Sequence, residues 1–165
     1  MPEHTHRYRT GLHWRGSTGD GYAAYDRAHT VTLGPAGTVL KLSADAAFRG
    51  SPELPSPEQL LLAAASSCQL LSFLALAARE GVDVQGYEDA AEAVMPDDVT
   101  PVRVTQITLR PRVVVAAEVA PERVRALLLR AHHECYVANS LTTTITLEPE
   151  ILRPDGRPFL ELQAD

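Results

Sequence analysis

Residues 56–81 constrain the fold of this chain most, because they predict a single long helix without charge in its middle. Ser56 is a suitable N-cap, Pro57 suits the first helical position, and Gln59 occupies the third position of a capping box. Gly81 is typical of the residue that ends a helix. Alanine and leucine, which have high helix propensities, fill the interior.

The 19 residues from Leu60 to Ala78 carry no charge, which is close to the ~20 residues that cross a bilayer. The sequence nevertheless favours a soluble helix, because serine and glutamine interrupt the run, six of the 19 residues are alanine, and no basic cluster flanks it. A helix that is apolar on all sides is otherwise buried in a core. We therefore expect a central helix that the rest of the protein wraps, with Cys68 in its middle.

Length and charge exclude several classes of protein. A chain of 165 residues predicts one domain, or half of the core of a dimer. Its 15 basic and 21 acidic residues give a net charge of −6, which argues against a nucleic-acid partner. The first four residues lack the apolar core of an export signal, so we expect a cytoplasmic protein.

Strand patterns precede and follow the predicted helix. Three strands form an antiparallel meander at 6–15, 22–33 and 38–43, with Arg27 in the middle of the second. The connection at 44–55 carries Arg49. Further strands are predicted at 82–95 and 102–116, with a closing strand within 139–152. We expect one α+β domain over residues 1–165, divided into 1–55, 56–81 and 82–165.

A second helix is predicted to begin at Pro121. One apolar stripe along it contains Val124, Leu127, Leu128, Ala131 and Cys135, so this cysteine faces the core. His132 and His133 lie beside it, but adjacent side chains point in different directions on a helix, and no second Cys/His cluster exists. We therefore predict no metal site.

Cys68 and Cys135 are predicted to face one core from two helices. Packed helices can bring two Cα atoms to the roughly 5.5–6 Å that a disulfide needs. The alternative is that both are inert, buried thiols. Glu58 lies ten residues before Cys68, roughly 15 Å along a straight helix. Either the helix breaks near residues 66–67, or Glu58 meets a cysteine from another subunit.

Two motifs resemble those of the OsmC/Ohr family, which comprises bacterial organic-hydroperoxide reductases. Ser-Pro-Glu-Gln-Leu at 56–60, with Ser-Cys at 67–68, is similar to the family's Asn-Pro-Glu-(Gln/Glu)-Leu…Ala-Cys element. Ala-His-His-Glu-Cys at 131–135 resembles its second element, and the order of elements matches along nearly the whole chain. Ser56 replaces the family's Asn, and Tyr136 follows the second cysteine where the family often has Pro, which indicates a divergent subgroup.

The resemblance implies an OsmC-like fold, with antiparallel β-sheets wrapped around two central helices, in an intertwined homodimer with active sites at the subunit interface. It implies an antioxidant enzyme of the oxidative stress response that reduces organic hydroperoxides. Cys68 would be the peroxidatic thiolate, Cys135 would resolve its sulfenic acid as a disulfide, and an external dithiol would restore both. No cofactor and no membrane or nucleic-acid partner is implied.

The resemblance also implies an arginine that stabilises the thiolate and is held by Glu58. Arg49 and Arg27 are the candidates, and Arg49 is preferred because a short flexible segment can fold over the helix. Either arginine could instead be an ordinary surface or ion-paired residue. The alternative function is a non-catalytic OsmC-fold protein, either a redox sensor or a binder of hydrophobic small molecules.

Overall fold

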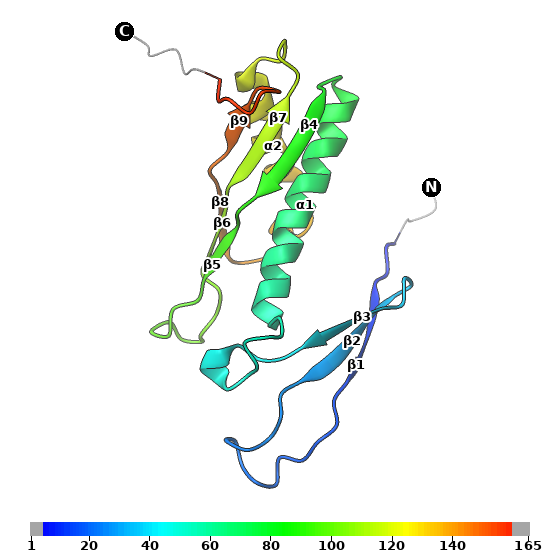
Figure 1. The fold of residues 1–165 in the computed structure, drawn as a ribbon, viewed down its shortest axis with the longest axis vertical. Coiled ribbons are helices and arrows are strands. Elements are labelled where there is room, and N and C mark those ends of the chain that lie inside the picture. The colour runs from blue at the N-terminus through cyan, green and yellow to red at the C-terminus, as the bar shows by residue number, and fades with distance from the viewer. Residues whose placement is uncertain (1–4, 160–165) are drawn as a thin grey trace. The chain divides into compact units, whose positions relative to one another are not determined.

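A computed structural model describes residues 5–159, and the chain forms two compact units that divide between Leu60 and Leu61. The first unit contains one antiparallel sheet in the order β1-β2-β3, followed by a short 3-10 helix (Figure 1). Its elements are β1 (Arg9–His13), β2 (His29–Gly34), β3 (Thr38–Leu42) and η1 (Ala46–Phe48). The predicted meander is confirmed.

The second strand begins later than the sequence predicts, because residues 22–27 form a loop. Arg27 donates hydrogen bonds to the carbonyl oxygens of Tyr22 and Tyr25, at 2.6 and 2.8 Å. The Asp26 carboxylate accepts a hydrogen bond from the backbone N–H of Ala28 at 2.9 Å. These side chains occupy backbone groups that a strand would pair with its neighbours, so residues 22–27 do not extend β2.

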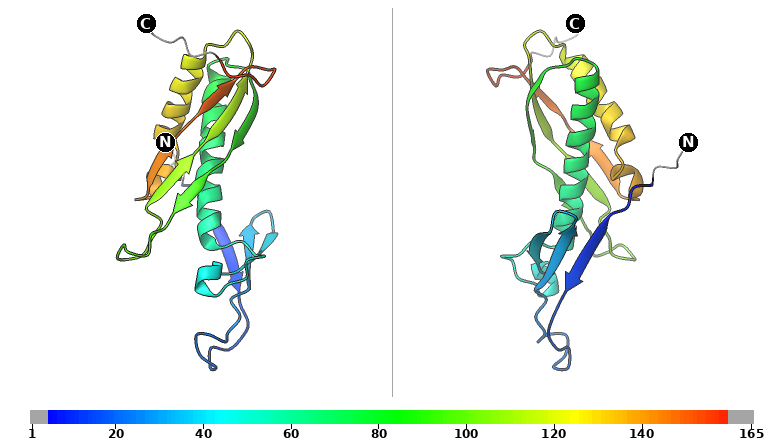
Figure 2. Two further views of the ribbon diagram at one scale, coloured as in Figure 1. Left: turned by 60° about the vertical axis from the view of Figure 1, so that its left-hand side comes forward. Right: turned by 90° about the vertical axis from the view of Figure 1, so that its right-hand side faces the viewer.

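Two mixed three-stranded sheets, in the orders β4-β7-β9 and β5-β6-β8, form the second unit together with two helices (Figure 2). Its elements are α1 (Pro57–Arg79, which begins at the end of the first unit), β4 (Val84–Asp89), β5 (Glu92–Val94), β6 (Gln106–Leu109), β7 (Pro111–Val115), α2 (Pro121–Glu134), η2 (Ala138–Ser140), β8 (Thr144–Leu147) and β9 (Glu150–Leu152). β8 is parallel to β6 and β9 is parallel to β7, whereas the other pairs are antiparallel.

The two long strands predicted at 82–95 and 102–116 are each divided between the two sheets. The division lies where the Asp89 carboxylate accepts hydrogen bonds from the Arg110 backbone N–H at 2.7 Å and from the Ser66 hydroxyl. Pro111 follows and has no N–H to donate. The backbone at residue 110 therefore bonds to a side chain instead of a neighbouring strand, and the chain passes from one sheet to the next.

Helix α1 has the predicted ends and no break. Ser56 and Gln59 form the capping box, with the Ser56 N–H donating to Gln59 Oε1 at 2.9 Å and the Gln59 N–H donating to Ser56 Oγ at 3.4 Å. Gly81 ends the helical region at φ 65°, a conformation that glycine adopts without strain. Of the two alternatives for Glu58, a break near residues 66–67 does not occur, because the helix is continuous from Pro57 to Arg79; the other, a cysteine from another subunit, stays a prediction.

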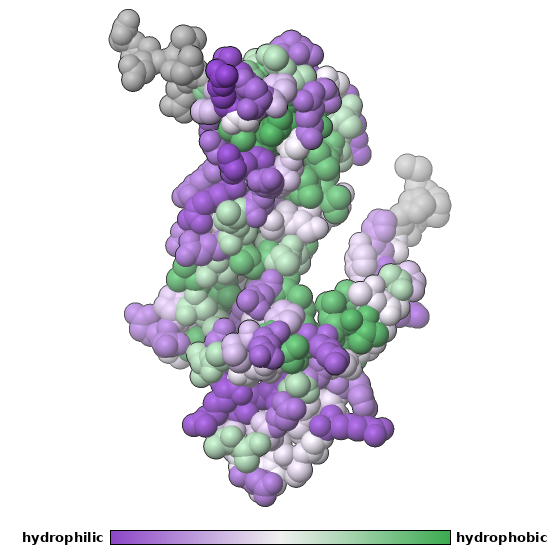
Figure 3. Space-filling model, viewed as in Figure 1, coloured by the Kyte–Doolittle hydropathy of each residue, from purple (hydrophilic) through white to green (hydrophobic). Residues whose placement is uncertain are grey.

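The chain does not enclose α1 on all sides. The buried face consists of Ala65, Gln69, Phe73, Leu76 and Ala77. Leu71 is 63% exposed, and Figure 3 shows apolar residues on the surface along the helix. By length and composition alone α1 could cross a membrane, with a mean hydropathy of 1.9 over 18 residues, 28% of which are buried. Only one face of α1 is therefore buried among the described residues, and the expected wrapping of the helix stays a prediction for its other face.

Helix α2 uses the apolar stripe that its sequence predicts. Its four apolar positions Val124, Leu127, Leu128 and Ala131 are buried, and Cys135 at the end of the helix is 1% exposed. The four apolar positions of α2 share a core with Phe73, Leu76 and Ala77 of α1 and with residues of β7 and β9. The two helices lie side by side against the strands of the second unit (Figure 2). This packing sets the distance between the two cysteines.

Candidate functional site

The structure brings the two predicted cysteines into contact. Both are free thiols, and the Cys135 thiol is hydrogen-bonded to Cys68. Cys68 lies on α1 and is partly exposed, whereas Cys135 is buried at the C-terminal end of α2. Because the two thiols are close and differ in exposure, they can react as a pair in which one meets solutes first.

A buried glutamine fastens α1 to α2 beside this pair. Gln69 is fully buried, and its Nε2 donates a hydrogen bond to the carbonyl oxygen of Leu128 at 3.0 Å. The sequence analysis did not identify Gln69 as a site residue. The signal was available, because an amide next to Cys68 within an uncharged helix predicts a buried polar contact.

Asn139 holds the segment that follows Cys135. Its Nδ2 donates to the carbonyl oxygens of His133 and Cys135, at 2.8 and 2.9 Å, and its backbone N–H donates to Cys135 as well, at 3.0 Å. The Ser140 hydroxyl donates to the carbonyl of Tyr136 at 2.7 Å. These bonds fold the segment over the cysteines, so that backbone N–H groups of residues 136–138 reach the two sulfurs. Nothing in the sequence analysis identified this role.

Hydrogen bonding makes the two thiols unequal in acidity. Burial by itself would raise the pKa of Cys68, but the Cys135 thiol, the Val137 N–H and the Ser72 hydroxyl bond to its sulfur and leave that pKa lowered. Burial raises the pKa of Cys135, and its hydrogen bond to Cys68 raises it further. Cys68 is therefore the thiol that ionises first, with protonated Cys135 as its donor.

Alkylation by iodoacetamide tests this asymmetry. We expect Cys68 to reach half-maximal reactivity at a pH below the pKa of about 8.5 of a free cysteine, and Cys135 at a higher pH. Cys135→Ala should move the Cys68 profile to higher pH because it removes a donor, whereas Cys135→Ser, which keeps a hydroxyl donor, should move it less. Mass spectrometry of each cysteine against pH measures both profiles. A Cys68 profile unchanged in Cys135→Ala would contradict the assigned cause.

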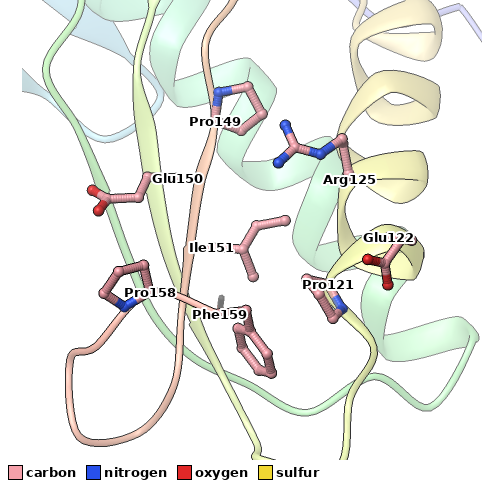
Figure 4. A pocket seen from close by; sticks show the side chains of 8 residues that line it. All are labelled: Pro121, Glu122, Arg125, Pro149, Glu150, Ile151, Pro158 and Phe159. Carbon is pink, nitrogen blue, oxygen red and sulfur yellow. The ribbon is translucent and has the colours of Figure 1, made fainter. Parts of the chain in front are cut away.

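A pocket of about 610 Å³ opens beside Cys68. Leu71, Leu76 and Tyr136 supply apolar walls. Ser72 and Asn139 supply polar groups, and Arg79 and Glu134 supply one charge of each sign. A smaller pocket of about 240 Å³ lies between the start of α2 and β9 (Figure 4). It is lined by Pro121, Glu122, Arg125, Pro149, Glu150, Ile151, Pro158 and Phe159, without a thiol. The larger pocket is therefore the one that can admit a substrate to Cys68.

Glu58 has no partner of its own within the described residues. It lies in the first turn of α1, and its Oε2 is buried without a hydrogen bond. Because α1 is unbroken, Glu58 remains about 15 Å from Cys68 along the helix axis. No ion pair joins it to Arg27 or Arg49 in residues 5–159. The carboxylate is thus available to a group from outside this chain.

The two candidate arginines differ in environment. Arg27 is 9% exposed, and its guanidinium carbon lies 4.0 Å from the ring centroid of Tyr25 and 4.7 Å from that of Tyr22. Arg49 is exposed and follows η1 with φ 65°. Neither pairs with a carboxylate in the described part of the chain. The structure thus holds Arg27 in one position, whereas no side-chain hydrogen bond or ion pair holds Arg49 among residues 5–159.

Within residues 5–159, no group of three or more His, Cys, Asp or Glu side chains is arranged to hold a metal ion. His132 is partly buried, and burial, together with the nearby His133, lowers its pKa. Its Nδ1 is enclosed without a hydrogen-bond partner, whereas His133 is exposed. The two adjacent histidines therefore face different surroundings.

Comparison with known proteins identifies similar folds and sequences. The OsmC-like protein family matches residues 50–150. An OsmC-like protein of unknown function from Vibrio cholerae is 27% identical, with a TM-score of 0.79 over 88% of this chain and 99% of that one. An organic hydroperoxide resistance protein OsmC from Legionella pneumophila is 16% identical, with a TM-score of 0.64 over 90% and 98%. OhrB of Bacillus subtilis, also an organic hydroperoxide resistance protein, is 16% identical, with a TM-score of 0.61 over 88% and 98%. No protein of curated function matches the sequence significantly.

Proposed function

Because this chain belongs to the OsmC-like protein family, we propose that it is a thiol-dependent peroxidase that reduces organic hydroperoxides. The observation that carries the proposal is the contact between two thiols of opposite pKa shift, with the more acidic one beside a pocket. The thiol that attacks the peroxide must be ionised. The second thiol, Cys135, stays protonated until Cys68 has been oxidised. The family includes proteins named for organic hydroperoxide resistance.

The proposed reaction has three steps. The Cys68 thiolate attacks the outer oxygen of the hydroperoxide, the O–O bond breaks, and the alkoxide leaves and is protonated to an alcohol. Cys68 is then a sulfenic acid, and the Cys135 sulfur attacks it, releasing water and forming the Cys68–Cys135 disulfide. An external dithiol reduces this bond by exchange. Overall, one hydroperoxide and one dithiol give one alcohol, one water and one disulfide.

We propose Arg27, rather than Arg49, as the cation that stabilises the thiolate and the leaving oxygen. A guanidinium acts best when it is held before the reaction, since no reorganisation is then needed in the transition state. The aromatic rings and carbonyl groups around Arg27 supply that restraint, whereas Arg49 is exposed and unrestrained. This reverses the preference for Arg49 that the sequence suggests.

Matched substitutions distinguish the two arginines. Arg27→Gln is expected to lower the rate of Cys68 oxidation by about 10²-fold, the scale seen when one charge-stabilising donor is removed. Arg49→Gln removes the same charge from an exposed site and should change the rate less than about twofold. Stopped-flow measurement of thiol oxidation gives both rates. Equal losses in the two variants would contradict the choice of Arg27.

We propose that two chains form a homodimer through the exposed side of α1. Leu71 and Leu74 are 63% and 37% exposed on this helix, and Glu58 has an enclosed oxygen without a partner. A second copy would cover apolar surface and could bring an arginine to Glu58, in keeping with the distance that separates Glu58 from Cys68 in one chain. Sedimentation equilibrium should give the mass of two 17.9 kDa chains. A monomer at micromolar concentration would contradict this proposal.

Steady-state turnover tests the proposed function. The reduced protein is supplied with cumene hydroperoxide and excess dithiothreitol, and peroxide loss is followed over many equivalents. A peroxidase consumes many equivalents per chain, whereas a redox sensor is oxidised once and stops. Parallel assays with hydrogen peroxide test the apolar character of the pocket, and we expect it to be the poorer substrate. Failure to turn over any hydroperoxide would overturn the proposal.

A further inference from the structure

We propose that the second unit carries a binding site for a free apolar α-amino acid, in the pocket between the start of α2 and β9. This inference does not rest on the peroxidase proposal. Every residue that lines the pocket lies between Pro121 and Phe159, and neither cysteine lines it. The site is therefore formed within one unit of the chain and can be tested without any thiol chemistry.

The first argument is the preformed apolar floor of the pocket. Figure 4 shows the side chains of Ile151 and Phe159 pointing into the space between β9 and α2, with Pro121 beside them. Ile151 is 5% exposed, and its carbonyl oxygen accepts a hydrogen bond from the Phe159 N–H at 3.4 Å. The guanidinium carbon of Arg153 lies 5.1 Å from the centroid of the Phe159 ring. Because these contacts exist before a ligand binds, binding orders few further groups.

The second argument is a pair of opposite charges that do not pair with one another. Arg125 and Glu122 line the pocket from α2, and neither forms an ion pair among residues 5–159. Residues three apart on a helix are neighbours, so these two side chains could have met. Figure 4 instead shows the guanidinium of Arg125 reaching toward Pro149 on the opposite wall. Both charges are therefore available to a ligand.

The remaining carboxylate beside the pocket is already occupied. Glu150 accepts a hydrogen bond from Nε of Arg112 at 2.8 Å. Successive side chains of a strand point to opposite faces, and Figure 4 shows the Glu150 carboxylate on the other side of β9 from Ile151. The pocket therefore offers a ligand one cation, one anion and an apolar floor.

This combination fits a zwitterion. The planar donors of Arg125 match the two oxygens of a carboxylate, and the carboxylate of Glu122 accepts hydrogen bonds from an ammonium group. Cβ atoms three residues apart on a helix are separated by about 5–6 Å, so the two charged groups on one α-carbon can reach both side chains. A ligand with a single charge would instead leave one of the two side chains without a partner.

The size of the pocket and its floor indicate the rest of the ligand. Its volume of about 240 Å³ lies below the roughly 300–1,000 Å³ typical of sites for drug-sized ligands. A single amino acid is of the smaller size that this volume admits. An apolar side chain that covers Ile151 and Phe159 removes apolar surface from water, which favours a leucine-like ligand over glycine.

Titration with L-leucine, followed in amide NMR spectra of the reduced protein, tests the site. Isocaproate has the same carbon skeleton without the ammonium group, and isoamylamine lacks the carboxylate. Arg125→Gln and Glu122→Gln each remove one proposed partner. Arg103→Gln is the matched control, because Arg103 is exposed and does not line the pocket. The same spectra show whether each variant is folded, and the comparison of the three ligands on the parent protein needs no variant.

We expect saturable shifts of amide signals from residues 121–125 and 149–159 with L-leucine, in the parent protein and in Arg103→Gln. Affinity should fall at least tenfold for isocaproate and isoamylamine, and for L-leucine in folded Arg125→Gln or Glu122→Gln. Absence of saturation at tens of millimolar L-leucine, or equal affinity for isocaproate, would overturn the proposal whatever the variants do. Because no peroxide is present, failure here leaves the turnover assay untouched, and loss of turnover does not alter this result.

Discussion

Replacing Cys68 with serine is expected to abolish hydroperoxide turnover. A hydroxyl does not ionise at neutral pH as the Cys68 thiol does, and the hydrogen bonds that lower the pKa of Cys68 cannot make serine a comparable nucleophile. Loss of a nucleophile in other enzymes costs about 10⁴–10⁶ in rate, so the variant should show no peroxide consumption above the uncatalysed reaction. The measurement is peroxide loss with excess dithiothreitol.

Cys135→Ser provides the control for that experiment. The variant keeps the Cys68 nucleophile and a hydrogen-bond donor at residue 135, so it should consume one equivalent of hydroperoxide at a rate near that of the parent. It should then stop as a sulfenic acid, become over-oxidised, or form a mixed disulfide with the reductant. Full turnover in Cys68→Ser, or equal turnover in both variants and the parent, would refute the assigned roles.

The largest effect on stability is expected from Leu128→Ala. Leu128 is fully buried in the core that α1, α2 and the strands of the second unit share. Truncation of a buried leucine leaves a cavity and costs about 2–5 kcal/mol in the free energy of unfolding. Urea denaturation of the reduced protein measures this loss. The same change should disturb the contact between the two cysteines, because the Leu128 side chain packs in the core that α1 and α2 share.

Leu129→Ala is the matched control on the same helix. Leu129 is 55% exposed, so its truncation should lower the free energy of unfolding by ~0.5 kcal/mol or less. The two variants differ by one position along the chain and remove the same atoms. Similar losses for both would mean that α2 does not bury the face formed by Val124, Leu128 and Ala131.

Helix ends were the most predictable part of the fold, because the signals are local. Ser56 and Gln59 bond one another across the first turn, and Gly81 adopts a positive φ directly after the last turn. The apolar stripe of α2 likewise predicted its buried face, including the burial of Cys135. Each of these features depends on residues within one helix, so the local sequence pattern is sufficient to predict it.

Features that depend on distant residues were not predictable. The long strands divide at Arg110 because the carboxylate of Asp89 bonds its N–H, a contact between residues 21 positions apart. The loop at 22–27, by contrast, is a local feature that the strand pattern missed, because the Arg27 side chain bonds carbonyls of its own segment. The sequence also could not predict which side of α1 is exposed. The helix is apolar on all sides, and an apolar side has the same composition whether this chain or another molecule covers it.

The candidate site likewise combines features that the sequence predicts with features that it does not. The helix patterns predicted that Cys68 and Cys135 face one core from two helices, and the structure brings the two thiols together. The uncharged helix around Gln69 signals a buried polar contact, but the sequence does not show that its partner is the Leu128 carbonyl, or that Asn139 folds the next segment over the sulfurs. The sequence favoured Arg49 over Arg27, because the burial of Arg27 and its contacts with aromatic rings become visible only in three dimensions.

Disulfide mapping after one equivalent of hydroperoxide tests the central claim most directly. The reduced protein is mixed with stoichiometric cumene hydroperoxide, free thiols are blocked with iodoacetamide, and the peptides are identified by mass spectrometry. We predict rapid formation of a Cys68–Cys135 disulfide within one chain that dithiothreitol reverses, at a yield near one bond per chain. Two alkylated, unoxidised cysteines after this treatment would contradict the proposed redox cycle while leaving the fold unchanged.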